Sequence, residues 1–449
     1  MESIPKLAIS STAKGPKRYD STRTYTFRYR AKRHCELPHV VKFSGGRSSG
    51  MLLFTLLENG FLKRDRGDLV VFNNTSCEHP ATYQFVAECK RRVETDYGIP
   101  FFLVQFQTYE DARQGEWRRL PTYRLVNEQP FSDRNPDGFD WRGEAFEEML
   151  SLKAYLPSQF RRVCTASLKL EVTRMFLRDW FASKESIPRL GHGMESSLVD
   201  VDQMHARHVR SGGGVPKHIL LRKREYVLSQ PTERPQQRYR DYSTPAEMFV
   251  NEHLQGKVFG RKAWFGAGGI EYVALIGLRG DEGLRVARVR ARSSDIHANV
   301  GYEGEHVYMP LTNMHVGRED VNDFWGEQDW GLRLDSNGAL SNCVYCFLKG
   351  LGNLERVHQE MEERKKRQVR GYGSTVDTPC DLDWWSRMER RYGRDLDEED
   401  RKRTNPDAQD FIGFFGASSD FSYDILATSK SGTDLSPYVH TVLPCDCTE

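Results

Sequence analysis

One short segment, residues 39–60, constrains the fold of this chain more than any other. It reads as an apolar strand, then the loop SGGRSSG (44–50), then an apolar helix that stops at Gly60. A Gly/Ser loop in this position is typical of phosphate binding in open parallel sheets. The glycines bring backbone N–H groups close to an anion, and the start of the helix adds its dipole.

The loop offers a phosphate several donors. Gly45 and Gly46 permit a tight turn, and Arg47 supplies a positively charged fork. Three hydroxyl groups add to these donors: Ser44, Ser48 and Ser49. The Walker pattern GxxxxGK[ST] is absent, which argues against a standard P-loop NTPase. By itself the loop leaves a second interpretation open, a plain Gly/Ser turn before a helix.

The following segments predict an α/β fold with a parallel sheet. Buried strands are expected at 68–75 and 99–107, with a helix from Pro80 between them, and this alternation is typical of parallel sheets covered by helices. Further along, the sequence predicts a loop at 108–144, a helix at 168–182 and a strand at 271–279. A last strand is expected at 306–311, followed by helices.

The length of 449 residues predicts two or three substructures. We expect an N-terminal arm at 1–37, the α/β domain at 38–311 with a basic insertion at about 205–265, a cysteine knuckle with helices at 312–375, and a C-terminal extension at 376–449.

Charge and hydropathy bear on location and partners. Lys plus Arg (65) nearly cancels Asp plus Glu (63), so only local charge can indicate a polyanionic partner. There is no apolar run of membrane-spanning length and no apolar signal core near the start, so we expect a cytoplasmic protein without membrane contact. In a reducing cytosol the nine cysteines are expected to be buried, metal-binding or reactive.

Charged residues gather just past the predicted strand at 271–279. Arg279 and Arg285 could clamp a pyrophosphate, while Asp281 and Glu282 could hold magnesium or orient the arginines. A surface cluster of salt bridges is the alternative that these residue types leave open.

Five segments together resemble the phosphoadenosine phosphosulfate (PAPS) reductase-like branch of the N-type ATP pyrophosphatases. They cover roughly residues 38–355 in the family's order: 44–50, FNNTSCEHPATYQFV (72–86), RRVCTASLK (161–169), IGLRGDEGLR (276–285) and NCVYCFLKG (342–350). The resemblance implies a Rossmann-like fold of the adenine nucleotide alpha hydrolase type, with ATP and Mg²⁺ bound at the Gly/Ser loop. Arg47 and Ser48 depart from the commoner Lys and Asp, which bears on how magnesium is held.

The resemblance also implies roles for single residues. Glu78 and Thr82 are expected to approach the nucleotide, and Lys169 to join the two arginines in neutralising charge. Cys343 and Cys346 form a CxxC pair, which presents two thiolates to one metal or cluster. Cys164 is the expected third ligand, and Cys380 or no protein residue the fourth. A 4Fe-4S cluster ranks ahead of zinc, and zinc ahead of a free redox pair.

Basic stretches raise the question of a nucleic-acid partner. They lie at 205–240, 285–292 and 363–370, and Tyr239, Trp264 and Phe265 could stack on bases. The alternative is a solvated face balanced by acidic residues elsewhere. Cys445 and Cys447 in the tail are either a mobile sulfur carrier or unremarkable.

The predicted function follows from the resemblance. It is an ATP pyrophosphatase that adenylylates an acceptor for sulfur transfer, most similar to the enzymes of DNA phosphorothioation. The expected partners are DNA, a cysteine desulfurase as sulfur donor and a multi-protein modification complex. The alternatives are a sulfonucleotide reductase, for which a C-terminal E-C-G-L-H-type segment is missing, a tRNA thiolation enzyme, and a nucleotide-binding scaffold without activity.

Overall fold

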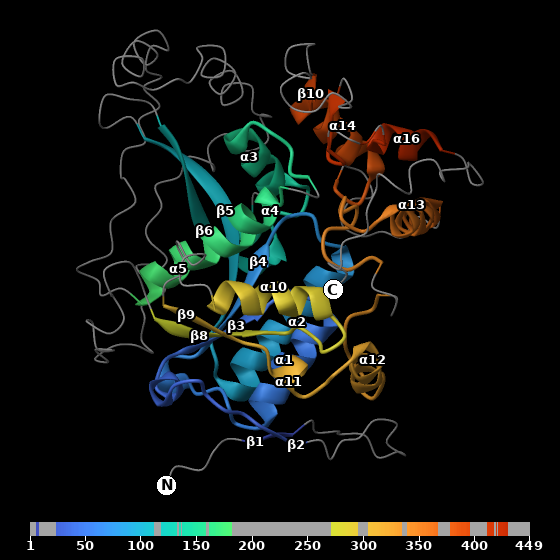
Figure 1. Ribbon diagram of the computed structural model, residues 1–449. Helices are drawn as coiled ribbons and strands as arrows, with labels where there is room; N and C mark the ends of the chain where they lie inside the picture. The colour runs from blue at the N-terminus through green and yellow to red at the C-terminus, as the bar shows by residue number, and fades with distance from the viewer. Residues whose placement is uncertain are drawn as a thin grey trace.

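A seven-stranded sheet forms the centre of the computed structural model (Figure 1). The structure describes residues 6–8, 24–111, 118–132, 134–135, 137–158, 161–181, 271–294, 304–334, 339–366, 378–395, 411–416, 419 and 421–429. In spatial order the strands are β7 (Gly138–Phe139), β6 (Arg118–Pro130), β5 (Phe101–Asp111), β4 (Leu69–Asn74), β3 (His39–Phe43), β8 (Tyr272–Ile276) and β9 (Glu305–Tyr308). Strands β5, β4, β3, β8 and β9 are parallel, so the α/β class with a mostly parallel sheet is confirmed.

The order of the parallel strands has a direct functional meaning. If these five strands alone are counted in chain order, β3 is the first and β9 the fifth, and their order across the sheet is 3-2-1-4-5. The direction in which the sheet grows therefore reverses between β3 and β8. Val40 of β3 pairs with Leu69 on one side and with Ala274 on the other. Ligands of doubly wound sheets bind outside the carboxyl ends of the strands at this reversal. The loops that follow β3 and β8 are therefore where a ligand-binding site is expected.

Helices cover both faces of the sheet, because neighbouring apolar residues of a buried strand point to opposite sides. Val41 and Val70 pack on one face with the helices α1 (Arg47–Glu58), α2 (Pro80–Tyr97), α11 (Pro310–Asn313) and α12 (Arg318–Gly326). Val40 and Val71 pack on the other face with α3 (Glu144–Lys153), α5 (Val172–Phe181), α13 (Leu351–Lys366), α14 (Leu382–Tyr392) and α16 (Tyr423–Thr428). The C-terminal helices thus share a continuous core with the sheet.

Shorter elements complete the described chain. They are β1 (Lys6–Ala8), β2 (Thr24–Thr26), η1 (Lys32–Cys35), η2 (Arg64–Arg66), α4 (Val163–Thr165), the π-helix η3 (Ala166–Glu171), α10 (Gly283–Ser294), β10 (Arg394–Asp395) and β11 (Phe411–Ile412). Among the described helices, none has the length and apolar character needed to cross a membrane.

The predicted loop at 108–144 was wrong. Strand β5 continues to Asp111, and β6 pairs with it antiparallel from Leu103↔Val126 to Asp111↔Arg118. The sequence of β6 hides this strand because it contains Pro121 and several charged residues, which are typical of loops and of strands near a sheet edge. The predicted insertion at about 205–265 lies outside the described residues.

Candidate nucleotide and thiol site

The Gly/Ser loop begins where β3 ends and passes directly into α1. Gly45 has a φ of 78°, and a Cβ there would lie 2.9 Å from Thr82 Cγ2 and 3.0 Å from Phe72 Cε2. A side chain is therefore excluded at this position by both conformation and space. Gly46 has a φ of −94°, and the nearest atom to its added Cβ is Ser44 Oγ at 3.5 Å. The two glycines thus differ in how strictly the fold requires them.

Two serine hydroxyls fasten the loop to the first turn of α1. The Ser44 N–H donates to Ser49 Oγ at 3.2 Å, and Ser49 Oγ donates to the Gly46 carbonyl at 3.0 Å. The hydroxyl oxygens of Ser44 and Ser49 lie 2.9 Å apart. Gly46 is the N-cap and has no side chain to accept from the first amides of the helix. These amides at the end of a parallel strand fit an anion such as phosphate.

The loop after β8 closes against this loop. Arg279 is 2% exposed, and its Nη1 donates to Ser48 Oγ at 3.1 Å. The backbones also approach closely, because a Cβ on Gly277 would lie 2.8 Å from Ser49 Cα. The first and fourth of the resembling segments therefore meet at the reversal of strand order.

Carboxylates hold the two arginines of this segment. Arg279 Nε donates to Asp281 Oδ1 at 2.8 Å, and the Arg279 N–H donates to Glu282 Oε2 at 2.9 Å. Glu282 also forms an ion pair with Arg285. Arg279 is thus fixed by both its side chain and its backbone, while Arg285 of α10 (Gly283–Ser294) is paired with Glu282, the residue just before that helix.

A cavity of about 860 Å³ opens beside Arg279. Asp281, His315, Gly317, Arg318 and Asp320 contribute to its lining. Its volume lies within the range that accommodates small molecules of nucleotide size. Its charged lining has two arginines, Arg279 and Arg318, and four carboxylates, so a phosphorylated ligand fits this cavity together with a divalent cation.

Arg47 makes contacts that the sequence did not predict. Its guanidinium donates to the Leu332 carbonyl at 3.1 Å and to the Leu334 carbonyl. Its own carbonyl accepts from Trp325 Nε1 at 2.8 Å. Arg47 therefore joins the loop to the segment that follows α12, and the predicted contact with phosphate would require these bonds to be exchanged.

Thr82 and Glu78, near the start of α2, differ in whether their side chains already have hydrogen-bond partners. Thr82 is buried with its Cγ2 beside Gly45, and its Oγ1 has no hydrogen-bond partner among the residues that the structure describes. Glu78 is engaged, because its carboxylate accepts from Thr75 Oγ1 at 2.6 Å and from the Tyr83 hydroxyl at 3.0 Å. Thr82 is thus the residue with a donor to offer a ligand, and Glu78 organises the turn after β4.

The CxxC knuckle is attached to that same turn. Glu78 and Cys343 form an isolated antiparallel bridge, and the Val344 N–H donates to the Cys77 carbonyl at 3.0 Å. Thr75 Oγ1 lies 3.5 Å from Cys343 Sγ. The knuckle therefore sits at the carboxyl end of β4, the strand next to the one that carries the Gly/Ser loop.

The three predicted metal ligands lie within electrostatic reach of one another. The pKa of Cys343 is lowered, mainly because Cys77 donates a hydrogen bond to it. Burial raises the pKa of Cys346 to about 12 and that of Cys164 to about 11, and negative charge on Cys343 adds to both shifts. Lys169, on the π-helix η3, favours the thiolates of Cys343 and Cys164. We call Cys77, Cys164, Cys343 and Cys346 the thiol cluster.

Two residues of this region had no role in the sequence interpretation. Cys77 is fully buried against Cys343, and its position just after β4 was the signal that could have identified it. Lys349 donates from Nζ to the carbonyls of Val344, at 2.7 Å, and Ala339. Burial lowers its pKa to about 8, and thiolates of Cys346 and Cys343 oppose this shift. Lys349 thus stabilises the knuckle through hydrogen bonds to its backbone and places a positive charge near the thiols.

Cys380, the candidate fourth ligand, lies just before α14. Burial, with a further contribution from Asp381, raises its pKa to about 12, and it raises the pKa of Cys77 in turn. It therefore lies within electrostatic range of both Cys77 and Lys349. The tail cysteines 445 and 447 fall outside the described residues.

The spacing of the sulfur atoms bears on which metal group would fit. Within the described chain, the group whose ligand atoms all lie within 4.8 Å of one another is His34, Glu271 and His306; the predicted thiol ligands do not form such a group. Two thiolates on a single zinc ion lie roughly 4 Å apart, because each Zn–S bond is about 2.3 Å. Ligands of an iron–sulfur cluster bind different iron atoms and lie farther apart. Three thiols are a donor set that both zinc and an iron–sulfur cluster accept.

Comparison with known proteins yields one short similarity. No protein-family model and no solved structure matches the chain. A segment of 69 residues is 46% identical to a protein of Escherichia phage lambda described as "Uncharacterized nin region protein ORF290". The matched segment covers 15% of this chain and 21% of the phage protein, so the similarity concerns a part of each protein.

Proposed function

We propose that this protein is an ATP pyrophosphatase that adenylylates a nucleic-acid acceptor, DNA in the first place, for sulfur transfer. The observation that carries the proposal is the contact between Arg279 and Ser48 at the reversal of strand order, with the thiol cluster at the end of the adjoining strand β4. A phosphate site and a sulfur site on neighbouring strand ends suit an enzyme that couples the two chemistries. The finer fold that we propose is the adenine nucleotide alpha hydrolase type.

The Gly/Ser loop would hold the phosphates of ATP. The amides after Gly46 have no side-chain cap, the hydroxyls of Ser44 and Ser49 lie beside them in the loop, and Thr82 Oγ1 is a buried donor without a partner among the described residues. A ligand that accepts from Thr82 would remove the cost of leaving this group unpaired. Arg279, oriented by Asp281, would neutralise the charge that develops on the departing pyrophosphate.

The chemistry has two steps. An oxygen of the acceptor attacks the α-phosphate, an O–P bond forms, and the bond to pyrophosphate breaks. The terminal sulfur of a persulfide, such as one formed by a cysteine desulfurase, then attacks the activated position of the acceptor, and AMP leaves with that oxygen. A cysteine thiolate cleaves the new S–S bond, so one sulfur stays on the acceptor and a protein disulfide forms, which a thiol reductant then reduces. Mg²⁺ would supply charge neutralisation for the phosphates, and Asp281, whose side chain is 44% exposed at the cavity, is a carboxylate that would hold it.

The thiol cluster would serve the second step. Cys164, Cys343 and Cys346 would hold an iron–sulfur cluster, which supplies sulfur-handling or redox chemistry, with zinc as the alternative. Lys169 and Lys349 place positive charge near these cysteines and favour their thiolates. Cys77 donates a hydrogen bond to Cys343 and so supports the same charge state.

Helix α10 supports a polyanionic acceptor. It begins at Gly283, which lines the cavity, and carries Arg288 and Arg290 with exposed side chains. A phosphate backbone lying along α10 would therefore reach the cavity at the start of the helix. The basic stretch at 205–240 lies outside the described residues.

The test measures products and binding together. With ATP, Mg²⁺, sulfide and duplex DNA, the protein should release AMP and pyrophosphate. Binding to DNA should weaken steeply with salt, because neutralised phosphates release counterions. The double variant Arg288→Ala/Arg290→Ala should bind all sequences more weakly and keep its DNA-independent ATP cleavage. Release of ADP and orthophosphate would contradict the proposal, and sulfite formed from phosphoadenosine phosphosulfate with reduced thioredoxin would favour the reductase.

A further inference from the structure

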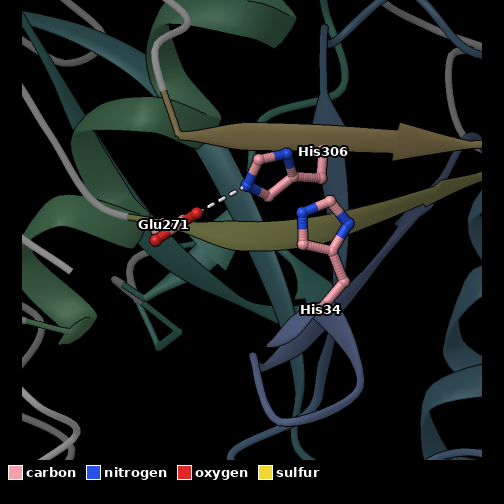
Figure 2. A group of neighbouring side chains, drawn as sticks. All are labelled: His34, Glu271 and His306. Carbon is pink, nitrogen blue, oxygen red and sulfur yellow. Dashed lines mark hydrogen bonds and ion pairs between the residues drawn. The ribbon is translucent and has the colours of Figure 1, made fainter. Parts of the chain in front are cut away.

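A second group of ligating side chains lies at the opposite end of the sheet from the nucleotide site. We propose that His34, Glu271 and His306 bind a divalent transition-metal ion, Zn²⁺ in the first place, which fastens the segment before β3 to the sheet. Their ligand atoms all lie within 4.8 Å of one another. Figure 2 shows the two imidazoles and the carboxylate gathered in one place, with His306 bonded to Glu271.

Three separate parts of the chain contribute these residues. His34 belongs to η1, Glu271 directly precedes β8, and His306 is the second residue of β9. Strand pairing fixes two of them, because Val273 lies opposite His306 and Tyr272 opposite Glu305. His34 and Glu271 are 5% and 7% exposed. Buried polar groups need partners, and a bound ion would be a partner that His34 and Glu271 share.

His34 is already oriented as a ligand. Its Nδ1 lies 2.8 Å from the Tyr308 hydroxyl, and that hydroxyl also accepts from the Arg30 N–H at 2.8 Å. When His34 donates from Nδ1 to Tyr308, the lone pair on Nε2 is left free. Histidines that bind metals commonly have such a partner on the other ring nitrogen.

The donor set selects the kind of ion. Two imidazoles and one carboxylate form a set found in three-ligand zinc sites, where a water completes the tetrahedron. Calcium and magnesium prefer oxygen ligands, so they are not expected here. A tetrahedral N₂O set with one bound water is therefore the arrangement that we propose.

Three contacts must change when the ion binds, and the first is the hydrogen bond between His306 Nε2 and Glu271. Arg33 pairs with the same Glu271 oxygen that accepts from His306, but its side chain is 59% exposed and can move into water. The His34 and His306 rings are stacked, with centroids 3.9 Å apart and planes at 26°. His306 is only half-buried, so it can turn until both lone pairs converge. Arg33 thus competes with the ion for Glu271.

The position of the group indicates a structural role. Glu271 precedes β8, and Gly277, which contacts the Gly/Ser loop, follows it. Six residues of extended chain span about 20 Å. The ion would therefore lie at the amino ends of the parallel strands, apart from the ATP chemistry, and its failure would leave the proposed function untouched.

The test is a cobalt titration of the full-length protein, followed by visible absorption and by equilibrium dialysis. Cobalt bound to thiolates gives charge-transfer bands in the near ultraviolet. Cobalt bound only to nitrogen and oxygen gives visible ligand-field bands without those charge-transfer bands. The near-ultraviolet absorption therefore distinguishes cobalt at the thiol cluster from cobalt at the proposed site. One equivalent of the second kind is expected, and Zn²⁺ should displace it. His306→Gln and Glu271→Gln should lose it, and His358→Gln, a half-buried histidine of α13, should retain it.

Two further variants separate metal binding from a hydrogen-bonded cluster. Tyr308→Phe should weaken cobalt binding about 10–100-fold, because the partner of a metal-bound histidine is lost. Arg33→Ala should tighten cobalt binding several-fold, because the competitor for Glu271 is removed. Arg33 is exposed, so this substitution should not disturb folding. A protein with no cobalt of the nitrogen–oxygen kind would overturn the proposal. Unchanged affinity in both His306→Gln and Arg33→Ala would overturn it equally.

Discussion

Arg279 donates a hydrogen bond to the Ser48 hydroxyl at 3.1 Å, although the two residues lie 231 positions apart in the chain. The contact joins the loops that follow β3 and β8, which are neighbours where the strand order reverses. Arg279 is 2% exposed and is oriented by Asp281. The positive charge is therefore in place before any ligand arrives, which is the condition for electrostatic stabilisation without reorganisation.

The first prediction concerns this arginine. Arg279→Lys should weaken ATP binding and pyrophosphate release about 10–100-fold, because hydrogen bonds to charged groups contribute about 1.5–3 kcal/mol and lysine cannot keep both contacts. Isothermal titration with ATP and a pyrophosphate assay measure the two effects. Arg288→Lys, an exposed site on α10, is the matched control. Full ATP affinity in Arg279→Lys would remove the residue from the nucleotide site.

The second prediction compares the two loop glycines. Gly45→Ala should lower the free energy of unfolding by about 1–3 kcal/mol and abolish ATP binding, because a Cβ at φ 78° meets Thr82 and Phe72. Gly46→Ala should fold normally, because its φ is −94° and its surroundings are open. Chemical denaturation and ATP titration of both variants check this. Equal stability of the two variants would mean that the loop has another conformation.

The third prediction concerns the thiol cluster. Anaerobically purified protein should contain iron and acid-labile sulfide, and Cys343→Ser, Cys346→Ser and Cys164→Ser should each lose most of both. Cys77→Ser should lose less, because Cys77 acts through its hydrogen bond to Cys343. Cys89→Ser is the control, since Cys89 is buried in the core on the other face of the sheet. Stoichiometric zinc without sulfide would replace the cluster assignment.

The fourth prediction is a pH dependence of stability. Glu389 is buried, and burial raises its pKa from 4.5 to about 7, although the N–H groups of Tyr423 and Phe414 donate to it. Between these values the unfolded chain releases a proton that the folded chain keeps. Stability should therefore fall as the pH rises from about 4.5 to 7, by up to about 3 kcal/mol.

The control for this effect is Glu389→Gln. Glutamine does not titrate, and it loses one of the two acceptors, so this variant should be less stable at pH 5. The difference in unfolding free energy between the two proteins should shrink from pH 5 to pH 7, as measured by urea denaturation. A difference that is constant with pH would show that the carboxyl is ionised at pH 5 in the folded chain.

Local signals in the sequence account for the parts of the fold that were predicted. The strand, loop and helix around Gly45 and the turn of the CxxC knuckle depend on neighbouring residues, and they were found. Strand β6 was missed because Pro121 and its charged residues suit a loop as well as a strand whose partner, β5, supplies the pairing.

Contacts between distant segments had no comparable signal. Cys77 meets Cys343 only because the knuckle pairs with the turn after β4. His34, Glu271 and His306 have no motif spacing, and they approach one another only when β8 and β9 pair. The contacts of Arg47 with Leu332 and Leu334 likewise depend on where the chain after α12 returns.

The pairing of β3 with β8 also sets the order of events during synthesis. Val41 pairs with Leu275, and Leu275 leaves the ribosome more than 200 residues later, so this pair cannot form until then. At typical rates of translation this delay is about 10–50 s. Throughout that time β3 has only β4 beside it and exposes an apolar edge that can pair with other chains. The nascent protein therefore exposes this edge until β8 emerges, and the proposed nucleotide site is among the last parts of the sheet to form.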